Sequence, residues 1–219
     1  MVRDGFFYAF GLGAVAAALW YLTMPVWLVA LPIVLAAFFL WFFRDPNRTI
    51  PQEPGQVVSP GDGLVTEAEW IETLSGSRLR LSIFLNVFDV HVNRAPVGGV
   101  VKVCEFRKGE FMNAMKPESV LNNEQTLITI DAGEYEVSFK QIAGLLARRI
   151  VCNLKVGDRV ERGQRIGLIK FGSRVDVLIP AEANLKVKTG SRVKGGSTVL
   201  AVLPGLTAQA ESAAVAVVA

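Results

Sequence analysis

The sequence is poor in the residues that build metal centres and disulfide scaffolds. Its 219 residues include one histidine, His91, and two cysteines, Cys104 and Cys152, which lie far apart and form no Cys-x-x-Cys. Zinc-ligand spacing is therefore absent, and we expect the two thiols to stay free, as small buried residues of a reducing compartment. The chain also has no aromatic-laced basic strand and no helix-turn-helix pattern, and its net charge is only +3. Nucleic acid is therefore not an expected partner.

Charged residues are missing altogether from residues 6–43, which hold no Asp, Glu, Lys, Arg or His. A single membrane span needs about 20 apolar residues, so this stretch suits two helices better than one. Pro25 restricts the backbone near the middle of the stretch and favours a turn there. The sequence predicts a transmembrane or membrane-inserted helical hairpin, with helices near residues 6–22 and 26–43, in an anchor that covers residues 1–48.

The charged residues that flank this stretch indicate its orientation. Arg3 precedes it and Arg44 follows it, so a hairpin places both on one side of the bilayer. By the positive-inside rule that side is the cytoplasmic side of the cell membrane, and the rest of the chain lies there as well. Two alternatives stay open. One is a signal peptide ending near Ala14-Val15-Ala16, with one span and an exported body; the other is a shallow hairpin that enters the membrane without crossing it.

After Arg44 the composition changes to that of a globular domain. Short apolar runs alternate with Gly, Pro, Asn and Asp, which is typical of a mainly β fold. Residues 155–166 and 188–199 repeat each other, with matching glycines at short turns. Such hairpins recur in the flattened barrel-sandwich of lipoyl and biotinyl domains. We therefore expect a β-rich domain over residues 49–204 and a flexible tail over residues 205–219.

Three sites in this domain have side chains suited to chemistry. Gly172-Ser173 lies between two apolar, strand-like runs, where a turn with an ordinary hydroxyl is the simplest interpretation. His91 is the only side chain whose unperturbed pKa is near neutrality, although a lone histidine is more often a packed or surface residue. Asp62, within Pro-Gly-Asp-Gly, is by default a turn aspartate that bonds its own backbone.

Four sequence blocks change this interpretation when they are taken together. They are residues 42–48 (FFRDPNR), 59–63 (SPGDG), 88–96 (FDVHVNRAP) and 171–176 (FGSRVD). In this order, behind an apolar anchor, they resemble the short form of the phosphatidylserine decarboxylase family over nearly all of the body. The resemblance implies that the chain acts on a phospholipid and converts phosphatidylserine to phosphatidylethanolamine.

The resemblance also implies a covalent cofactor that the chain makes from itself. Ser173 attacks the carbonyl group of Gly172, the backbone is cleaved between the two residues, and Ser173 becomes a pyruvoyl group. The products, residues 1–172 and 173–219, stay together as a heterodimer, with a higher oligomer left open. An electron sink of this kind suits a decarboxylation, and no metal is implied.

Asp62 and His91 are the candidates for supporting roles. Asp62 would orient or stabilise the base, and His91 would be the base that activates Ser173, the later proton donor, or both. The longer family form has a second histidine where this chain has Arg94, so the complete Asp-His-Ser relay does not transfer. The cationic Arg94 suits the substrate phosphate or carboxylate instead. The alternative function is a non-enzymatic, membrane-anchored barrel-sandwich adaptor, which leaves the blocks around His91 and Ser173 unexplained.

Overall fold

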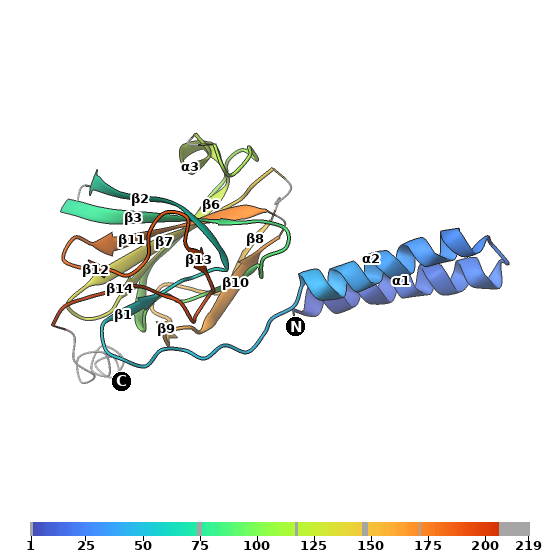
Figure 1. Cartoon of the computed structure of the whole chain (residues 1–219), viewed down its shortest axis with the longest axis horizontal. Helices are drawn as coiled ribbons and strands as arrows, with labels where there is room; N and C mark the ends of the chain where they lie inside the picture. The colour runs from blue at the N-terminus through green and yellow to red at the C-terminus, as the bar shows by residue number, and fades with distance from the viewer. Residues whose placement is uncertain (1, 74–75, 117, 146–148, 171, 206–219) are drawn as a thin grey trace. The chain divides into compact units, whose positions relative to one another are not determined.

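The chain forms two compact units, Met1–Asn47 and Arg48–Ala219, in a computed structural model (Figure 1). The described residues are 2–73, 76–116, 118–145, 149–170 and 172–205. Phe171, from the fourth sequence block, and residues 206–219 of the predicted tail lie outside them.

The first unit is a helical hairpin. Helix α1 spans Arg3–Tyr21 and helix α2 spans Val26–Phe42, with Thr23 at φ 51° in the turn between them. The ring of Tyr8 stacks on that of Phe39, with the ring centroids 4.8 Å apart, so aromatic contacts hold the two helices together. Among the described residues no helix is both long and apolar enough to cross a membrane, and the transmembrane hairpin is not confirmed.

The second unit is mainly β, as the sequence predicted. Eight strands form one sheet in the order β13-β2-β3-β11-β7-β6-β5-β9, and two smaller sheets have the orders β1-β14-β12 and β4-β10-β8 (Figure 1). The elements are β1 Gln56–Val58, β2 Gly63–Thr73, β3 Gly76–Leu85, β4 Val92–Arg94, β5 Gly99–Arg107, α3 Ser119–Asn122, β6 Gln125–Asp131, β7 Glu136–Ile142, β8 Ile150–Cys152, β9 Arg159–Val160, β10 Arg165–Ile169, β11 Ser173–Pro180, β12 Asn184–Leu185, β13 Arg192–Val193 and β14 Val199–Val202.

Strand β11 lies inside the large sheet, between β3 and β7. Its alternate residues Val175, Val177 and Ile179 are fully buried and belong to the hydrophobic core. Side chains two residues apart in a strand share a face, so Ser173 belongs to the same inward series. The strand therefore directs the Ser173 hydroxyl towards the core of the domain and away from water.

The internal repeat occupies the two edges of the large sheet. Strands β9 and β13 come from the two copies and pair with β5 and β2, respectively. Gly157 and Gly190 have φ values of +90° and +88°, a region that favours glycine. Their amides donate to the carbonyl oxygens of Val101 and Val65. The two copies thus close the sheet in the same way at opposite edges.

Candidate active site

Ser173 is the first residue of β11, where it pairs with Leu85 of β3. The residue is fully buried, and its Oγ has no hydrogen-bond partner among the described residues. Gly172, just before it, has a φ of +55°, which most other residues adopt only with strain. A buried hydroxyl without a partner costs about 1–3 kcal/mol, so this segment is a candidate for chemistry.

His91 lies directly beside this segment and is almost fully buried. Its Nδ1 is 2.9 Å from the carbonyl oxygen of Asp89, which can only accept a hydrogen bond, so Nδ1 carries the proton. The other ring nitrogen, Nε2, accepts a hydrogen bond of 3.2 Å from the amide of Gly172. The unprotonated nitrogen of a neutral imidazole is thus directed at the Gly172 amide, next to Ser173, and among the described residues it makes no hydrogen bond to Ser173 Oγ.

Gly144 packs against the carbonyl group of Gly172. A Cβ atom on Gly144 would lie 2.1 Å from the Gly172 oxygen and 3.4 Å from Cβ of Ala114. Only glycine therefore leaves room for the Gly172 carbonyl in this position. Sequence reasoning missed this residue, because the contact joins the loop after β7 to the start of β11 and leaves no local pattern.

A buried pair of side-chain amides, those of Gln141 and Asn93, lies on the face of the large sheet to which Ser173 belongs. Nε2 of Gln141 donates to Oδ1 of Asn93 over 2.8 Å, and both residues are fully buried. The Oε1 atom of Gln141 has no hydrogen-bond partner among the described residues. Asn93 also donates a long bond, 3.4 Å, to the carbonyl oxygen of Pro60. The pair therefore ties β7 to β4, the strand that follows His91. The sequence contains one indication of this pair: Gln141 is a polar residue in an inward-facing alternate series that otherwise holds Val137 and Phe139.

Asp62 is held by groups other than His91. One carboxylate oxygen accepts a bond of 2.7 Å from Arg48, and the other accepts a bond of 2.8 Å from the amide of Gly195. Burial raises the pKa of the Asp62 carboxyl above its ordinary value, although the Gly195 amide and the Arg48 cation act in the opposite direction. Among the described residues, neither carboxylate oxygen bonds to His91, so the structure does not bring these two candidates into one relay.

Arg94 lies at the end of β4 and is 6% exposed. Its Nη1 donates to the carbonyl oxygen of Gly163 over 3.0 Å, and its backbone amide donates to Pro60 over 2.9 Å. The side chain also passes close to Gly196, where a Cβ would lie 2.8 Å from Cδ of Arg94. At least one N–H group of the guanidinium is thus hydrogen-bonded within the domain, next to the glycine turns of the internal repeat.

Arg174, directly after Ser173, belongs to a buried charge network on the other face of the sheet. Its Nε donates to Asp176 over 2.5 Å and its Nη2 donates to Glu67 over 2.8 Å. Burial alone would lower the pKa of Arg174, but the bond to Asp176 and the charges of both carboxylates raise it above its ordinary value. The network fixes the backbone on the downstream side of Gly172–Ser173.

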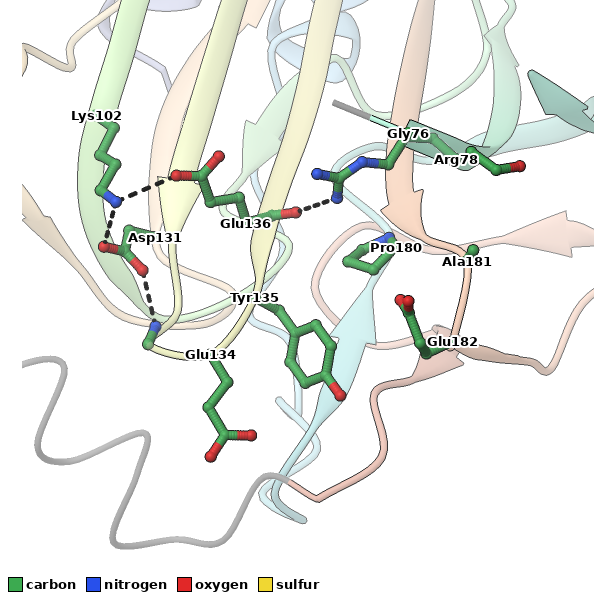
Figure 2. Close-up of a pocket in the computed structure, with 12 residues that line it drawn as sticks. Gly76, Arg78, Lys102, Asp131, Glu134, Tyr135, Glu136, Pro180, Ala181 and Glu182 are labelled. Atoms are coloured by element: carbon green, nitrogen blue, oxygen red, sulfur yellow. Dashed lines mark hydrogen bonds and ion pairs between the residues drawn. The ribbon is translucent and has the colours of Figure 1, made fainter. Parts of the chain in front are cut away.

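A hollow of about 610 Å³ lies far from these residues, at the Pro180 end of β11 (Figure 2). Lys102 is paired there with Asp131 and Glu136, and Arg78 donates to the carbonyl oxygen of Glu136. Three charged groups of this hollow, those of Lys102, Asp131 and Glu136, thus pair with one another. Because Ser173 stands at the opposite end of an eight-residue strand, the hollow is separate from the candidate site.

The chain is similar to known proteins along most of its length. The family model described as phosphatidylserine decarboxylase matches residues 35–201. A phosphatidylserine decarboxylase proenzyme of Solibacter usitatus is 48% identical over 202 residues, which cover 92% of this chain and 96% of the relative. Proteins with the same name are 48% identical in Symbiobacterium thermophilum, covering 78% of this chain and 81% of the relative, and 42% identical in Carboxydothermus hydrogenoformans, covering 94% and 97%.

Proposed function

The chain belongs to the phosphatidylserine decarboxylase family, and we propose that its active form arises by cleavage of its own backbone between Gly172 and Ser173. The activity removes the serine carboxyl group of phosphatidylserine as CO2, which leaves phosphatidylethanolamine. One observation carries the cleavage proposal: a buried Oγ of Ser173 without a described partner follows a glycine whose amide contacts His91.

The proposed cleavage uses only groups of the chain and water. His91 Nε2 accepts the proton of the Ser173 hydroxyl, and Oγ attacks the carbonyl carbon of Gly172. The C–N bond breaks, an ester forms, and the nitrogen of Ser173 becomes a free amine. Loss of the Cα proton of residue 173 then breaks the Cβ–Oγ bond and releases residues 1–172 as a carboxylate. Water replaces the nitrogen on the remaining dehydroalanine, ammonia leaves, and a pyruvoyl group remains.

The residues around Ser173 fit such a group. The pyruvoyl group would supply an electron sink for the negative charge that remains when CO2 leaves. The close approach of Gly144 fixes the Gly172 carbonyl before cleavage. His91 contacts the same segment, and the bond from its Nδ1–H to the Asp89 carbonyl oxygen leaves Nε2 as the unprotonated ring nitrogen, the atom proposed to take up and return a proton. Burial of the site excludes bulk water from these proton transfers.

Asp62 and Arg94 complete the proposed set of site residues. We propose that Asp62 acts as a positioning residue, because its bonds to Arg48 and Gly195 fasten the loop of residues 59–63. The carbonyl oxygen of Pro60 in this loop accepts a hydrogen bond from the backbone amide of Arg94. Arg94 follows His91 closely in the chain, so the loop is joined to the segment that carries the histidine. The guanidinium of Arg94, always cationic, is proposed to attract the phosphate or carboxylate of the substrate.

The anchor and the fine architecture also remain proposals. We propose that the hairpin of α1 and α2 enters the cell membrane and keeps the body on the cytoplasmic side, next to its phospholipid substrate. Exposed apolar side chains along both helices, Phe7 and Trp27 among them, support insertion, and Arg3 and Arg44 support the orientation.

The paired repeat turns at opposite sheet edges support a barrel-sandwich related to lipoyl and biotinyl domains.

Electrophoresis and mass spectrometry of the full chain in membranes test the cleavage. We expect residues 1–172 and 173–219 to separate under denaturing conditions, with the smaller fragment lighter than a serine-started peptide by the mass of ammonia. Ser173→Ala is expected to stay intact at 23.8 kDa and to be inactive. Ser138→Ala is the control, because the Ser138 hydroxyl bonds to the Thr129 hydroxyl across the sheet and not to the candidate site. A wild-type chain that stays uncleaved, without a carbonyl-bearing fragment, would overturn the proposal and favour the adaptor.

A further inference from the structure

Four exposed apolar side chains gather at the end of the body where Ser173 lies. Phe88, Met115, Leu121 and Leu145 have exposed fractions of 67%, 59%, 66% and 61%. Single exposed apolar residues are common, but a group contributed by several loops around one site calls for an explanation. We name these four residues the docking rim.

The sheet register places the loops of the docking rim around the site. Strand β3 ends at Leu85, which pairs with Ser173, and the loop that follows carries Phe88. Strand β7 ends at Ile142, which pairs with Gln125 where β6 begins. Strand β5 ends beside the same residue of β6. The connections that carry the other rim residues therefore leave the sheet at the end where β11 starts.

The segments that bear the docking rim also pack on the cleavage segment itself. Nδ2 of the fully buried Asn123, next to α3, donates to the carbonyl oxygen of Ala143 over 2.7 Å. The next residue, Gly144, touches both the Gly172 carbonyl and Ala114. Rim residues and reacting backbone thus belong to one packed layer, in which each rim side chain is close along the chain to a residue that holds the site.

Charged side chains alternate with the docking rim. Lys108, Lys116 and Arg149 are exposed in these loops, against the exposed acidic residues Glu110 and Glu118. Apolar tips among exposed charged side chains, with a small excess of positive charge, are typical of a surface that lies at an anionic membrane interface. A purely aqueous surface would not concentrate apolar side chains at its loop tips.

We propose that the docking rim inserts into the interface of the lipid bilayer that carries the substrate. This inference rests on the activity of the family, because phosphatidylserine is held in a membrane while Ser173 is buried inside the body. The headgroup reaches Ser173 only if the face around the site meets the lipid surface. Insertion of the rim removes four apolar side chains from water and brings the site to the level of the headgroups.

Two substrates in one preparation test the proposal. The full, self-cleaved chain in phosphatidylcholine vesicles is assayed with long-chain phosphatidylserine in the same bilayer, and with dihexanoyl phosphatidylserine dissolved as monomers. Met115→Ser/Leu121→Ser is expected to lose about tenfold or more of the rate on the bilayer substrate and to stay within about twofold on the monomers. Trp70→Ser/Val156→Ser is the matched control, since these residues are 58% and 65% exposed away from the site.

Self-cleavage of each variant serves as the check on folding and separates this test from that of the proposed function. If the double variant fails to cleave itself, Phe88→Ser probes the rim from a different loop, with the same expected split between substrates. Equal loss on both substrates would make the rim a part of the catalytic site. An unchanged rate on the bilayer substrate would mean that the rim does not touch lipid. Either result overturns the proposal.

Discussion

The backbone amide of Gly172 donates a hydrogen bond of 3.2 Å to Nε2 of His91. The bond places the only histidine of the chain at the peptide segment that we propose is cleaved, although the two residues are far apart in sequence. A second contact orients the ring. Nδ1 of His91 bonds to the carbonyl oxygen of Asp89, whereas the carboxylate of Asp62 is paired with Arg48. A backbone carbonyl group, rather than the Asp62 carboxylate, thus holds the ring so that Nε2 is the unprotonated nitrogen.

Replacing His91 by asparagine should slow self-cleavage by about 10²–10⁴-fold, the range typical of a lost general base. The time course of cleavage in newly made chain, followed by denaturing electrophoresis, measures the effect. A purely structural role is separated by His91→Gly, for which added imidazole should restore part of the rate. Cleavage of both variants at the wild-type rate would exclude His91 as the base.

Gly144→Ala should block or strongly slow cleavage, because the new Cβ would lie 2.1 Å from the Gly172 oxygen and must displace the reacting carbonyl. Gly98→Ala is the matched control, because its Cβ would meet its nearest neighbour at an ordinary 3.5 Å. Both variants are compared by the fraction of chain cleaved at fixed times. Equal cleavage in the two would show that the approach of Gly144 has no part in positioning Gly172.

Arg174→Met should destabilise the body by about 3–5 kcal/mol, because it leaves the carboxylate of Asp176 buried without its cation. Urea unfolding in the uncleaved Ser173→Ala background measures the loss on a single chain. Arg174→Met/Asp176→Leu should recover part of the stability, since it removes both buried charges. A double variant as unstable as the single one would mean that the packing of the arginine stem, rather than its charge, is what matters.

The Cys104 thiol should react slowly with iodoacetamide at neutral pH and faster as the pH rises towards 11. Burial, followed by the nearby Cys152, raises the pKa of Cys104 to about 11, and the thiolate is the reactive form. Because the folded pKa lies above the unfolded one, the contribution of this thiol to stability is complete below about pH 9 and is lost as the pH rises through 11. Mass spectrometry of folded and urea-unfolded chain measures the alkylation. Equal rates at neutral pH would contradict the raised pKa.

The two thiols illustrate what residue spacing leaves undetermined. Sequence reasoning expected separate free cysteines, and both are free, but their sulfur atoms lie 3.8 Å apart because β5 and β8 come together in the fold. The same limit applies to Gly144 and Gln141, whose partners Gly172 and Asn93 are distant in the chain. No local pattern marks such contacts.

The sequence by itself determined the family, the mainly β class and the identity of Ser173 and His91 as the residues to examine. These features depend on residue types at short fixed spacings, which a chain carries whether or not it is folded. Only the tertiary structure decided which groups meet. His91 contacts Gly172, and Asp62 contacts Arg48 in place of His91, because strand order and register bring these residues together. The geometry of the site therefore follows from pairings between distant segments, which are fixed only when the core packs.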